Sequence, residues 1–168
     1  MKMITAVLLF LLAGLTAAAQ DSYTQAQKGE QVPEFTFESQ PGVSRKISDY
    51  KGKVVLITFF ATWCGPCRME LPHVDRELYQ PYRKRSDFVV LTFGREHDWE
   101  TVNKFKASNK LEMPLYPDPK REIFTKFAAQ NIPRNFLIDQ SGRIVYSSVG
   151  FNEAEFAVLK NTIAGLLK

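Results

Sequence analysis

The pattern of hydrophobic and polar residues predicts strands and helices that alternate along most of the chain. The clearest segment is Val54–Phe60, an unbroken run of β-branched, aliphatic and aromatic residues. Such a run is typical of a strand that is buried on both faces of a sheet. A similar run over Phe88–Phe93 predicts a second buried strand, and the alternation over Val32–Phe37 predicts a shorter one.

The segment after the first of these strands has the periodicity of a helix. Within Pro66–Gln80 the apolar residues recur every three or four positions and form one stripe, at Cys67, Leu71, Val74 and Leu78. Pro72 lies inside this segment. We expect it to kink the helix, because proline has no backbone N–H group and its ring clashes with the preceding turn.

Three more helices are indicated by their capping residues. Asp98 can cap one of them. Asp118, which is followed by a proline, predicts the start of another that runs towards Gln130. Asn152, with Glu155 three residues later, has the spacing of a capping box and predicts the last helix.

Two short strands close to the C-terminus predict a hairpin. Phe136–Ile138 and Ile144–Tyr146 are apolar, and the link between them is short and contains a glycine, which favours antiparallel pairing. Together with the strand–helix–strand unit before it, the hairpin predicts one α/β domain with a mixed sheet. In such a sheet, functional sites gather at the carboxyl edge of the parallel strands.

The first residues have the features of an export signal. Lys2 gives a positive start, Ile4–Leu15 is an almost unbroken apolar run, and Ala17–Ala19 supplies the small residues that a signal peptidase reads. Because a membrane span needs about 20 apolar residues, we favour a cleaved signal over an uncleaved anchor and expect a periplasmic or otherwise extracytoplasmic protein. The predicted division is a signal peptide over residues 1–19, a flexible segment over 20–31 and one domain over 32–168.

Composition narrows the class of protein further. The chain has 168 residues, of which 45% are hydrophobic and 24% are charged. This is the composition of one packed globular domain and not of a disordered or collagen-like chain. The net charge of +4 is small, and the densest basic run, Arg83–Arg85, is interpreted as solvated surface. We therefore expect no nucleic-acid partner.

Only two cysteines are present, Cys64 and Cys67. A scaffold held by disulfides needs more of them. A structural zinc site needs four ligands, and the spacing of His73 and His97 fits no finger pattern. The two cysteines stand at the start of the helix predicted over Pro66–Gln80, where they can close a disulfide with little change of the backbone. In an exported chain with no other cysteine, this arrangement predicts thiol–disulfide exchange.

The position of each cysteine on the helix predicts its role. The backbone N–H groups of the first turn and the helix dipole favour a thiolate at Cys64, which makes Cys64 the expected attacking nucleophile. Cys67 lies one turn deeper on the apolar stripe and is expected to resolve the mixed disulfide that Cys64 forms. An inert buried pair, or half of a metal site, is the alternative.

Residues 61–68, with the sequence Ala-Thr-Trp-Cys-Gly-Pro-Cys-Arg, resemble the active site of thioredoxin-fold oxidoreductases. Met69–Pro72, Gly52–Leu56 and Ile132–Pro133 make the chain similar to the exported TlpA/ResA-like thiol–disulfide oxidoreductases of the redoxin group. The resemblance covers roughly residues 32–168. It implies an α/β, thioredoxin-like fold with a mixed central β-sheet and helices on both faces.

The resemblance also implies which residues bind the substrate. Pro133 would be a cis proline that lies against the disulfide, and the backbone of Ile132 would pair with an extended substrate strand. Trp63 would form an apolar rim beside Cys64, with a core aromatic as its alternative. Residues 97–98, His-Asp, would either border the site or serve only their loop and the following helix cap.

Charged and polar neighbours of the cysteines are implied in the same way. Glu70 would approach Cys67 and act as a possible proton relay, with a solvated helix acid as the alternative. Thioredoxins carry a buried aspartate on the strand before the cysteines, where this chain has Thr58. Arg134 would lie near Cys64 and either favour its thiolate or select acidic partners.

The sequence therefore predicts a reductase of protein disulfides that works through the Cys64–Cys67 couple and uses no metal or other cofactor. Its partners would be disulfide-containing exported proteins and an upstream thiol electron donor, and it would contact the membrane only if the signal stays uncleaved. A peroxiredoxin-type peroxidase is one alternative, although Ile57 and Ala61 stand where that chemistry generally needs proline and threonine or serine. A non-enzymatic metal- or partner-binding module is the other.

Overall fold

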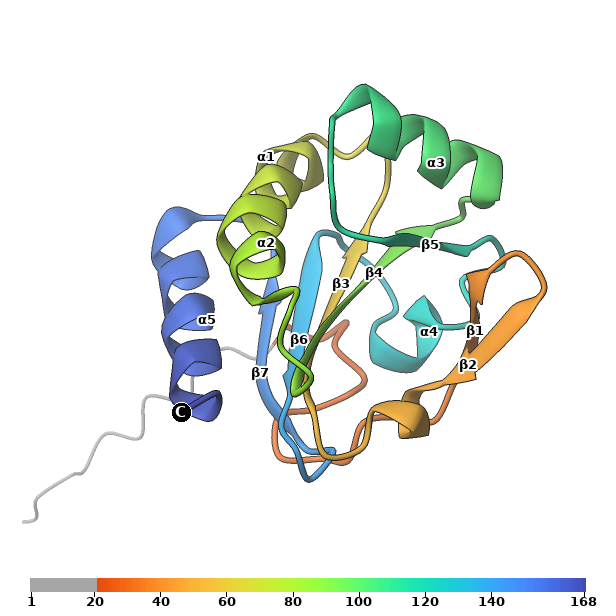
Figure 1. The fold of residues 1–168 in the computed structure, drawn as a ribbon. Helices are drawn as coiled ribbons and strands as arrows, with labels where there is room; N and C mark the ends of the chain where they lie inside the picture. The colour runs from red at the N-terminus through yellow and green to blue at the C-terminus, as the bar shows by residue number, and fades with distance from the viewer. Residues whose placement is uncertain (1–20) are drawn as a thin grey trace, which may run out of the picture.

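The structure is a computed structural model that describes residues 21–168, so the predicted signal peptide over residues 1–19 lies outside the described residues. Figure 1 shows helices packed against a twisted sheet. Within residues 21–168, no helix has the length and apolar character to cross a bilayer. The elements in chain order are β1 (Thr36–Gln40), β2 (Val43–Lys46), the 3-10 helix η1 (Ile47–Tyr50), β3 (Val54–Phe60), α1 (Gly65–His73), the π-helix η2 (Val74–Tyr79), α2 (Gln80–Tyr82), β4 (Phe88–Arg95), α3 (Trp99–Ser108), β5 (Leu115–Asp118), α4 (Phe124–Phe127), β6 (Arg134–Ile138), β7 (Ile144–Val149) and α5 (Glu153–Leu166).

Within residues 21–168, five strands form the central sheet, in the order β5-β4-β3-β6-β7. β3 is parallel to β4 and β4 to β5, whereas β6 is antiparallel to both β3 and β7. The predicted mixed sheet and C-terminal hairpin are therefore confirmed. β1 and β2 form a separate antiparallel hairpin, where the sequence predicted a single strand over Val32–Phe37. Gly42, with a φ of 77°, lies in the turn of this hairpin.

Alternating side chains along β3 divide the core into two layers. Every residue of β3 is buried. Leu56 and Phe60 pack with residues of α1, α3 and α5 on one face of the sheet. Ile57 and Phe59 pack with residues of α4, η1 and the N-terminal segment on the other. The continuous apolar run thus has the two-sided burial that the sequence predicted.

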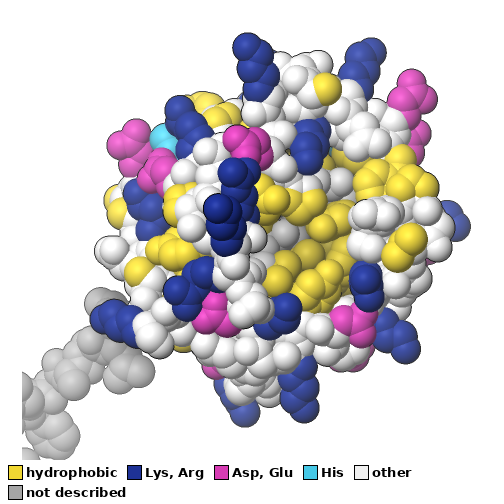
Figure 2. Space-filling model, viewed as in Figure 1, with side chains coloured by type: hydrophobic (Ala, Val, Ile, Leu, Met, Phe, Trp, Pro, Cys, Tyr) yellow, Lys and Arg dark blue, Asp and Glu magenta, His cyan; other side chains and the backbone are white. Residues whose placement is uncertain are grey.

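One edge of the sheet is only partly covered. Among the described residues, β5 pairs with Thr92–Arg95 and not with the first half of β4. On the side of the molecule seen in Figure 2, hydrophobic side chains gather in the middle and towards the β1–β2 hairpin, and lysine and arginine side chains are spread around them. Such charges discourage a second chain from pairing with an open edge.

The helix that was predicted to kink at Pro72 changes its type there. α1 ends at His73, directly after Pro72, and the chain continues as the π-helix η2 and then α2. Pro72 cannot donate a backbone hydrogen bond to the preceding turn, and π-helical turns are a common way to absorb such a defect. The N–H of Val74 accordingly faces the carbonyl oxygens of both Glu70 and Leu71.

The helix predicted from Asp118 to Gln130 is wrong in its extent. Asp118 ends β5, and only Phe124–Phe127 form a helical turn. The Asp118 carboxylate still caps that turn from a distance, because it accepts hydrogen bonds from the N–H groups of Ile123 (3.1 Å) and Phe124 (2.8 Å). Between them Arg121 adopts a φ of 60°, which a helix does not allow.

The segment predicted to be flexible, residues 20–31, is packed against the domain over the part that is described. Thr24 forms a β-bridge with Ala128, and Gln31 forms one with Arg143. Ala26 is buried in the layer that contains α4. Because α4 is only one turn long, this face of the sheet needs further cover, and the N-terminal segment provides it. The segment was predicted to be flexible because its residues are mostly polar, and that composition gives no indication that it packs against the domain.

Candidate active site

The two cysteines lie at the junction between β3 and α1, as the sequence predicted. Cys64 is the N-cap of α1, and Pro66 lies in its first turn. The cysteines form a disulfide with an S–S distance of 2.07 Å and a Cα–Cα distance of 5.3 Å. The N–H of Cys67 lies 3.2 Å from the sulfur of Cys64 and points at it. The helix N-terminus therefore presents a hydrogen-bond donor to the outer sulfur.

A groove opens beside Cys64. Cys64 is 5% exposed and Cys67 is fully buried, so the outer sulfur alone can meet another molecule. The groove has a volume of about 680 Å³. The residues that line it are Trp63, Cys64, Gly65, Pro66, Arg95, Arg121, Ala129, Gln130, Asn131 and Ile132.

Trp63 and Ile132, two of the three residues predicted to bind the substrate, border this groove, whereas Pro133 is buried and is not among the lining residues. The Ile132–Pro133 peptide bond is cis, and the carbonyl oxygen of Ile132 lies 3.7 Å from the sulfur of Cys64. Trp63 is 64% exposed, which makes the core-aromatic alternative wrong. Its ring forms one wall of the groove, next to the side chain of Arg95.

Glu70 lies one turn after Cys67 on α1 and is 2% exposed, so the solvated-acid alternative is wrong. Burial raises the pKa of Glu70 to about 7, although a hydrogen bond from Asn135 opposes the shift. The amide nitrogen of Asn135 donates to Oε1 at 2.6 Å, whereas Oε2 is buried and has no hydrogen-bond partner among the described residues. A protonated carboxyl group is the form that such surroundings favour.

Asn135 is a site residue whose role the sequence did not reveal. Its side-chain oxygen accepts a hydrogen bond from the hydroxyl of Thr58 at 2.8 Å, and its nitrogen reaches Glu70. The three side chains form a buried polar chain under α1. Thr58 on β3 is paired with Asn135 on β6. A polar residue at each of these positions, in strands that are mostly apolar, is the signal that could have identified Asn135.

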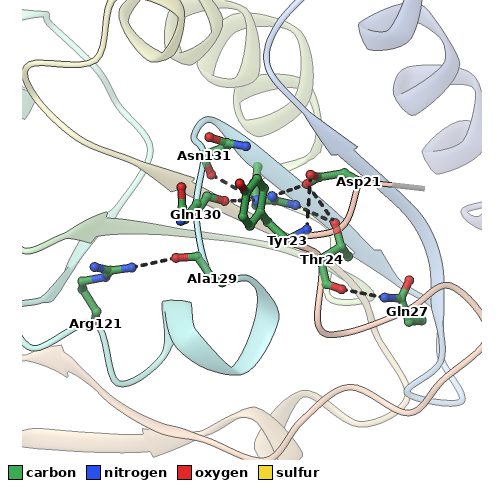
Figure 3. Close-up of polar contacts among 9 residues, drawn as sticks. Asp21, Tyr23, Thr24, Gln27, Arg121, Ala129, Gln130 and Asn131 are labelled. Atoms are coloured by element: carbon green, nitrogen blue, oxygen red, sulfur yellow. Dashed lines mark hydrogen bonds and ion pairs between the residues drawn. The ribbon is translucent and has the colours of Figure 1, made fainter. Parts of the chain in front are cut away.

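The expectation that Arg134 lies near Cys64 is wrong. Consecutive residues of a strand point to opposite faces, so Arg134 is buried on the face away from α1. It makes an ion pair with Asp21 and donates to Thr24 at 2.7 Å and to the carbonyl oxygens of Gln130 (2.8 Å) and Asn131 (3.0 Å). Figure 3 shows these partners on two sides, the N-terminal segment and the loop beside the groove.

His97 has a role in the fold. His97 is buried, accepts a hydrogen bond at Nε2 from the N–H of Thr62 (2.8 Å), and has Nδ1 3.0 Å from the carbonyl oxygen of Glu96. It thus supports the loop that carries Trp63 and Cys64. Asp98 caps α3, which confirms that prediction. Among residues 21–168, no three His, Cys, Asp or Glu side chains gather in a way that could hold a metal ion.

The chain is similar to known thiol–disulfide oxidoreductases. The Redoxin family matches residues 27–163. The thiol-disulfide oxidoreductase ResA of Geobacillus kaustophilus is 31% identical over 83% of this chain and 82% of its own.

Solved structures show the same fold. A Bacteroides thetaiotaomicron protein, provisionally named a protein disulfide isomerase, has a TM-score of 0.82 and 35% identity over 86% of this chain and 92% of its own. A Chlorobium tepidum protein, provisionally named thiol:disulfide interchange protein DsbE, has a TM-score of 0.75 and 29% identity over 85% of this chain and 99% of its own. The predicted thioredoxin-like fold is confirmed.

Glu70→Gln should remove a pH dependence from the stability of the oxidised protein. The pKa of Glu70 is raised from 4.5 to about 7 in the folded state, so its stabilising effect is complete below pH 4.5 and is lost as the pH rises through 7. Relative to the variant, the wild type should lose about 3 kcal/mol of unfolding free energy between pH 4.5 and 8. Urea unfolding at several pH values measures this, and parallel profiles would contradict it.

Asp21→Asn should lower the unfolding free energy at neutral pH by about 1–3 kcal/mol, because the buried guanidinium of Arg134 loses its anionic partner. Burial is the largest influence on Asp21 and opposes its ionisation, but the hydrogen bonds from Arg134, Tyr23 and Thr24, together with the charge of Arg134, outweigh burial and lower the pKa. The stabilisation should therefore disappear as the pH falls through that lowered value. Glu34→Gln, at an exposed position of the same region, is the control; an equal loss in both variants would refute the role of the ion pair.

Proposed function

The chain belongs to the redoxin family and is a thiol–disulfide oxidoreductase, and we propose that it acts outside the cytoplasm as a reductase of protein disulfides. The observation that carries the proposal is the disulfide at the N-terminus of α1, of which only Cys64 reaches the groove. The N-terminal sequence, with its apolar run and small residues before position 20, supports export. The Gly-Pro pair between the cysteines, which resembles that of reducing members of the family, supports the direction.

The reaction begins with the reduced protein. The thiolate of Cys64 attacks one sulfur of a substrate disulfide, a mixed disulfide forms, and the other substrate sulfur leaves as a thiolate that takes up a proton. Cys67 then loses its proton and attacks the sulfur of Cys64. This closes the Cys64–Cys67 disulfide and releases the second substrate thiol. An upstream dithiol donor reduces the protein again.

The geometry supports the role proposed for each sulfur. The N–H of Cys67 points at the sulfur of Cys64, and a helix N-terminus stabilises negative charge, so a thiolate on Cys64 is favoured. Cys67 is fully buried, and the sulfur that lies within its reach is that of Cys64. Cys64 is therefore the nucleophile and Cys67 the resolving residue.

Glu70 is assigned the proton transfer of the second step. A carboxyl group with a pKa of about 7 exists in both protonation states near neutral pH, which is what a proton relay requires. It projects from α1 one turn after Cys67, and Asn135 holds its Oε1 while Oε2 is unpartnered. We propose that Glu70 accepts the proton of Cys67.

The substrate is proposed to lie along the loop that ends in Pro133. The carbonyl oxygen of Ile132 faces the sulfur of Cys64 and could pair with the backbone of an extended segment. Trp63 offers an exposed apolar surface on the other side of the groove. A disulfide-bearing segment could thus be held between them.

Cys67→Ala should accumulate covalent adducts with disulfide-containing proteins. The variant keeps the attacking thiol but lacks the thiol that resolves the mixed disulfide, and because it cannot form its own disulfide, adduct formation reports attack on disulfides. Diagonal electrophoresis of tagged protein, with and without dithiothreitol, measures the yield. Cys64→Ala is the control and should give far fewer adducts, since Cys67 is buried. Equal yields from both variants would refute the assignment.

Glu70→Gln should slow the second step while it leaves the first unchanged. In the wild type, the rate of release from a preformed mixed disulfide should change with a midpoint near pH 7, the pKa of Glu70. The variant should lack this midpoint, and its rate should be about 10- to 100-fold lower. Stopped-flow release of a chromophoric thiol measures both. A profile that is the same in both proteins would exclude the relay.

A further inference from the structure

We propose that Arg95 and Arg121 form an anion-binding subsite in the groove beside Cys64, and that this subsite favours disulfide substrates with a carboxylate close to the cysteine that is attacked. The proposal rests on the function proposed above and concerns the substrate class of the same site. Both arginines line the groove, together with Trp63, Cys64 and the loop at residues 129–132. No acidic residue is among the lining residues.

Aromatic rings hold the two guanidinium groups in place. The Cζ atom of Arg95 lies 5.5 Å from the ring of Trp63 and 5.2 Å from the ring of Phe124. The Cζ atom of Arg121 lies 5.5 Å from the same Phe124 ring. A guanidinium group that stacks on a ring keeps the N–H groups at its edges available. The stack therefore preorganises donors in the groove that Cys64 also lines.

The donors of the two arginines exceed the acceptors that the fold supplies. The carboxylate of Glu96 is 3.3 Å from Arg95 and 3.7 Å from Arg121, so it serves two cations with one charge. Arg121 also donates to the carbonyl oxygen of Ala129 at 2.9 Å, as Figure 3 shows. The Nε atoms of both arginines are buried and have no hydrogen-bond partner among the described residues. One positive charge remains for a ligand, together with those terminal N–H groups that Glu96 and Ala129 do not use.

A carboxylate of a peptide fits this surplus. Planar guanidinium groups bind carboxylates through two parallel hydrogen bonds. The side chain of Arg95 is 14% exposed and that of Arg121 is 32% exposed, so both are partly shielded from water yet can be reached from the groove. The substrates of the proposed reaction are polypeptides, and an acidic side chain close to their cysteine would reach the subsite while the cysteine meets Cys64.

The subsite should act on binding and not on chemistry. The carboxylate takes no part in the exchange of sulfurs, and its contacts are equal before and during the reaction, so they lower KM without raising kcat. Because the arginines are partly exposed, added salt should weaken the effect. These two properties separate a substrate-binding role from a structural one.

The test uses disulfide-linked peptides of one length that carry glutamate, glutamine or lysine beside the cysteine, with blocked ends and dithiothreitol as the donor. For the wild type, the KM of the glutamate peptide should be about fivefold below that of the glutamine peptide, with equal kcat. A further peptide with neutral side chains and a free C-terminal carboxylate shows whether a terminal carboxylate serves as well. Equal KM values for the three blocked peptides would overturn the subsite.

Charge reversal provides a result that misfolding cannot imitate. Arg121→Glu should invert the preference, so that the lysine peptide has the lowest KM, while turnover of the glutamine peptide continues. Arg45→Glu makes the same change of charge on β2, away from the groove, and should leave the order of the peptides as in the wild type. If Arg121→Glu keeps the wild-type order, the proposal is refuted.

A binding measurement keeps the subsite separate from the proposed reaction. Labelled peptides with serine in place of cysteine cannot react, and fluorescence anisotropy reports their binding to the oxidised protein. Tighter binding of the glutamate peptide to the wild type than to Arg121→Glu supports the subsite even if no peptide is reduced. Failure of the wild type to turn over any peptide would contradict the reductase function, and equal binding of all peptides would contradict the subsite.

Discussion

Complete burial of β3 is the constraint on which the redox site depends. A strand with both faces covered has little freedom to tilt or slip, because every residue is packed and pairs with β4, and residues 55–59 also pair with β6. The chain leaves this strand at Phe60 and enters α1 at Gly65. Cys64 is thereby held at the N-cap, where the helix N–H groups meet its sulfur. The position of Cys64 at the helix N-terminus therefore depends on the fixed end of β3.

Two neighbouring residues of β6 make hydrogen bonds that hold the surroundings of the disulfide in place. Asn135 points towards α1 and joins Glu70 to Thr58, whereas Arg134 points the other way and fixes the carbonyl groups of the loop before Pro133. One network surrounds the buried carboxyl group and the other holds the rim of the groove. Because neighbouring residues of one strand anchor them, the two sides of the site are set at a constant separation.

The sequence revealed those features that local patterns encode. The apolar run of β3 and the capping residue Asn152 act within a few residues, and the structure has each as predicted. The cysteine pair with its flanking motif belongs to the same class. Burial of Glu70 was left open, because a single acid on a helix gives no sign of what will pack over it.

Features that depend on distant contacts were missed. Asp118 looked like a helix cap followed by its helix, but pairing with β4 extends the strand through it. The polar residues 21–31 looked loose because the face that they cover is built from segments far along the chain. Arg134 was placed beside Cys64 because its sequence neighbour Pro133 lies there, and only the pleat of a paired strand sends its side chain elsewhere.

The ion pair between Asp21 and Arg134 also bears on the order in which the chain folds. It joins residues that are 113 positions apart, and the entropy lost on closing a loop grows with its length. Neighbouring strands and hairpins can form earlier, since they enclose much shorter loops. Loop-closure entropy therefore predicts that the rim of the groove is among the last parts to become fixed. We therefore expect the cysteines of a newly made chain to be in place before the rim of the groove beside them is complete.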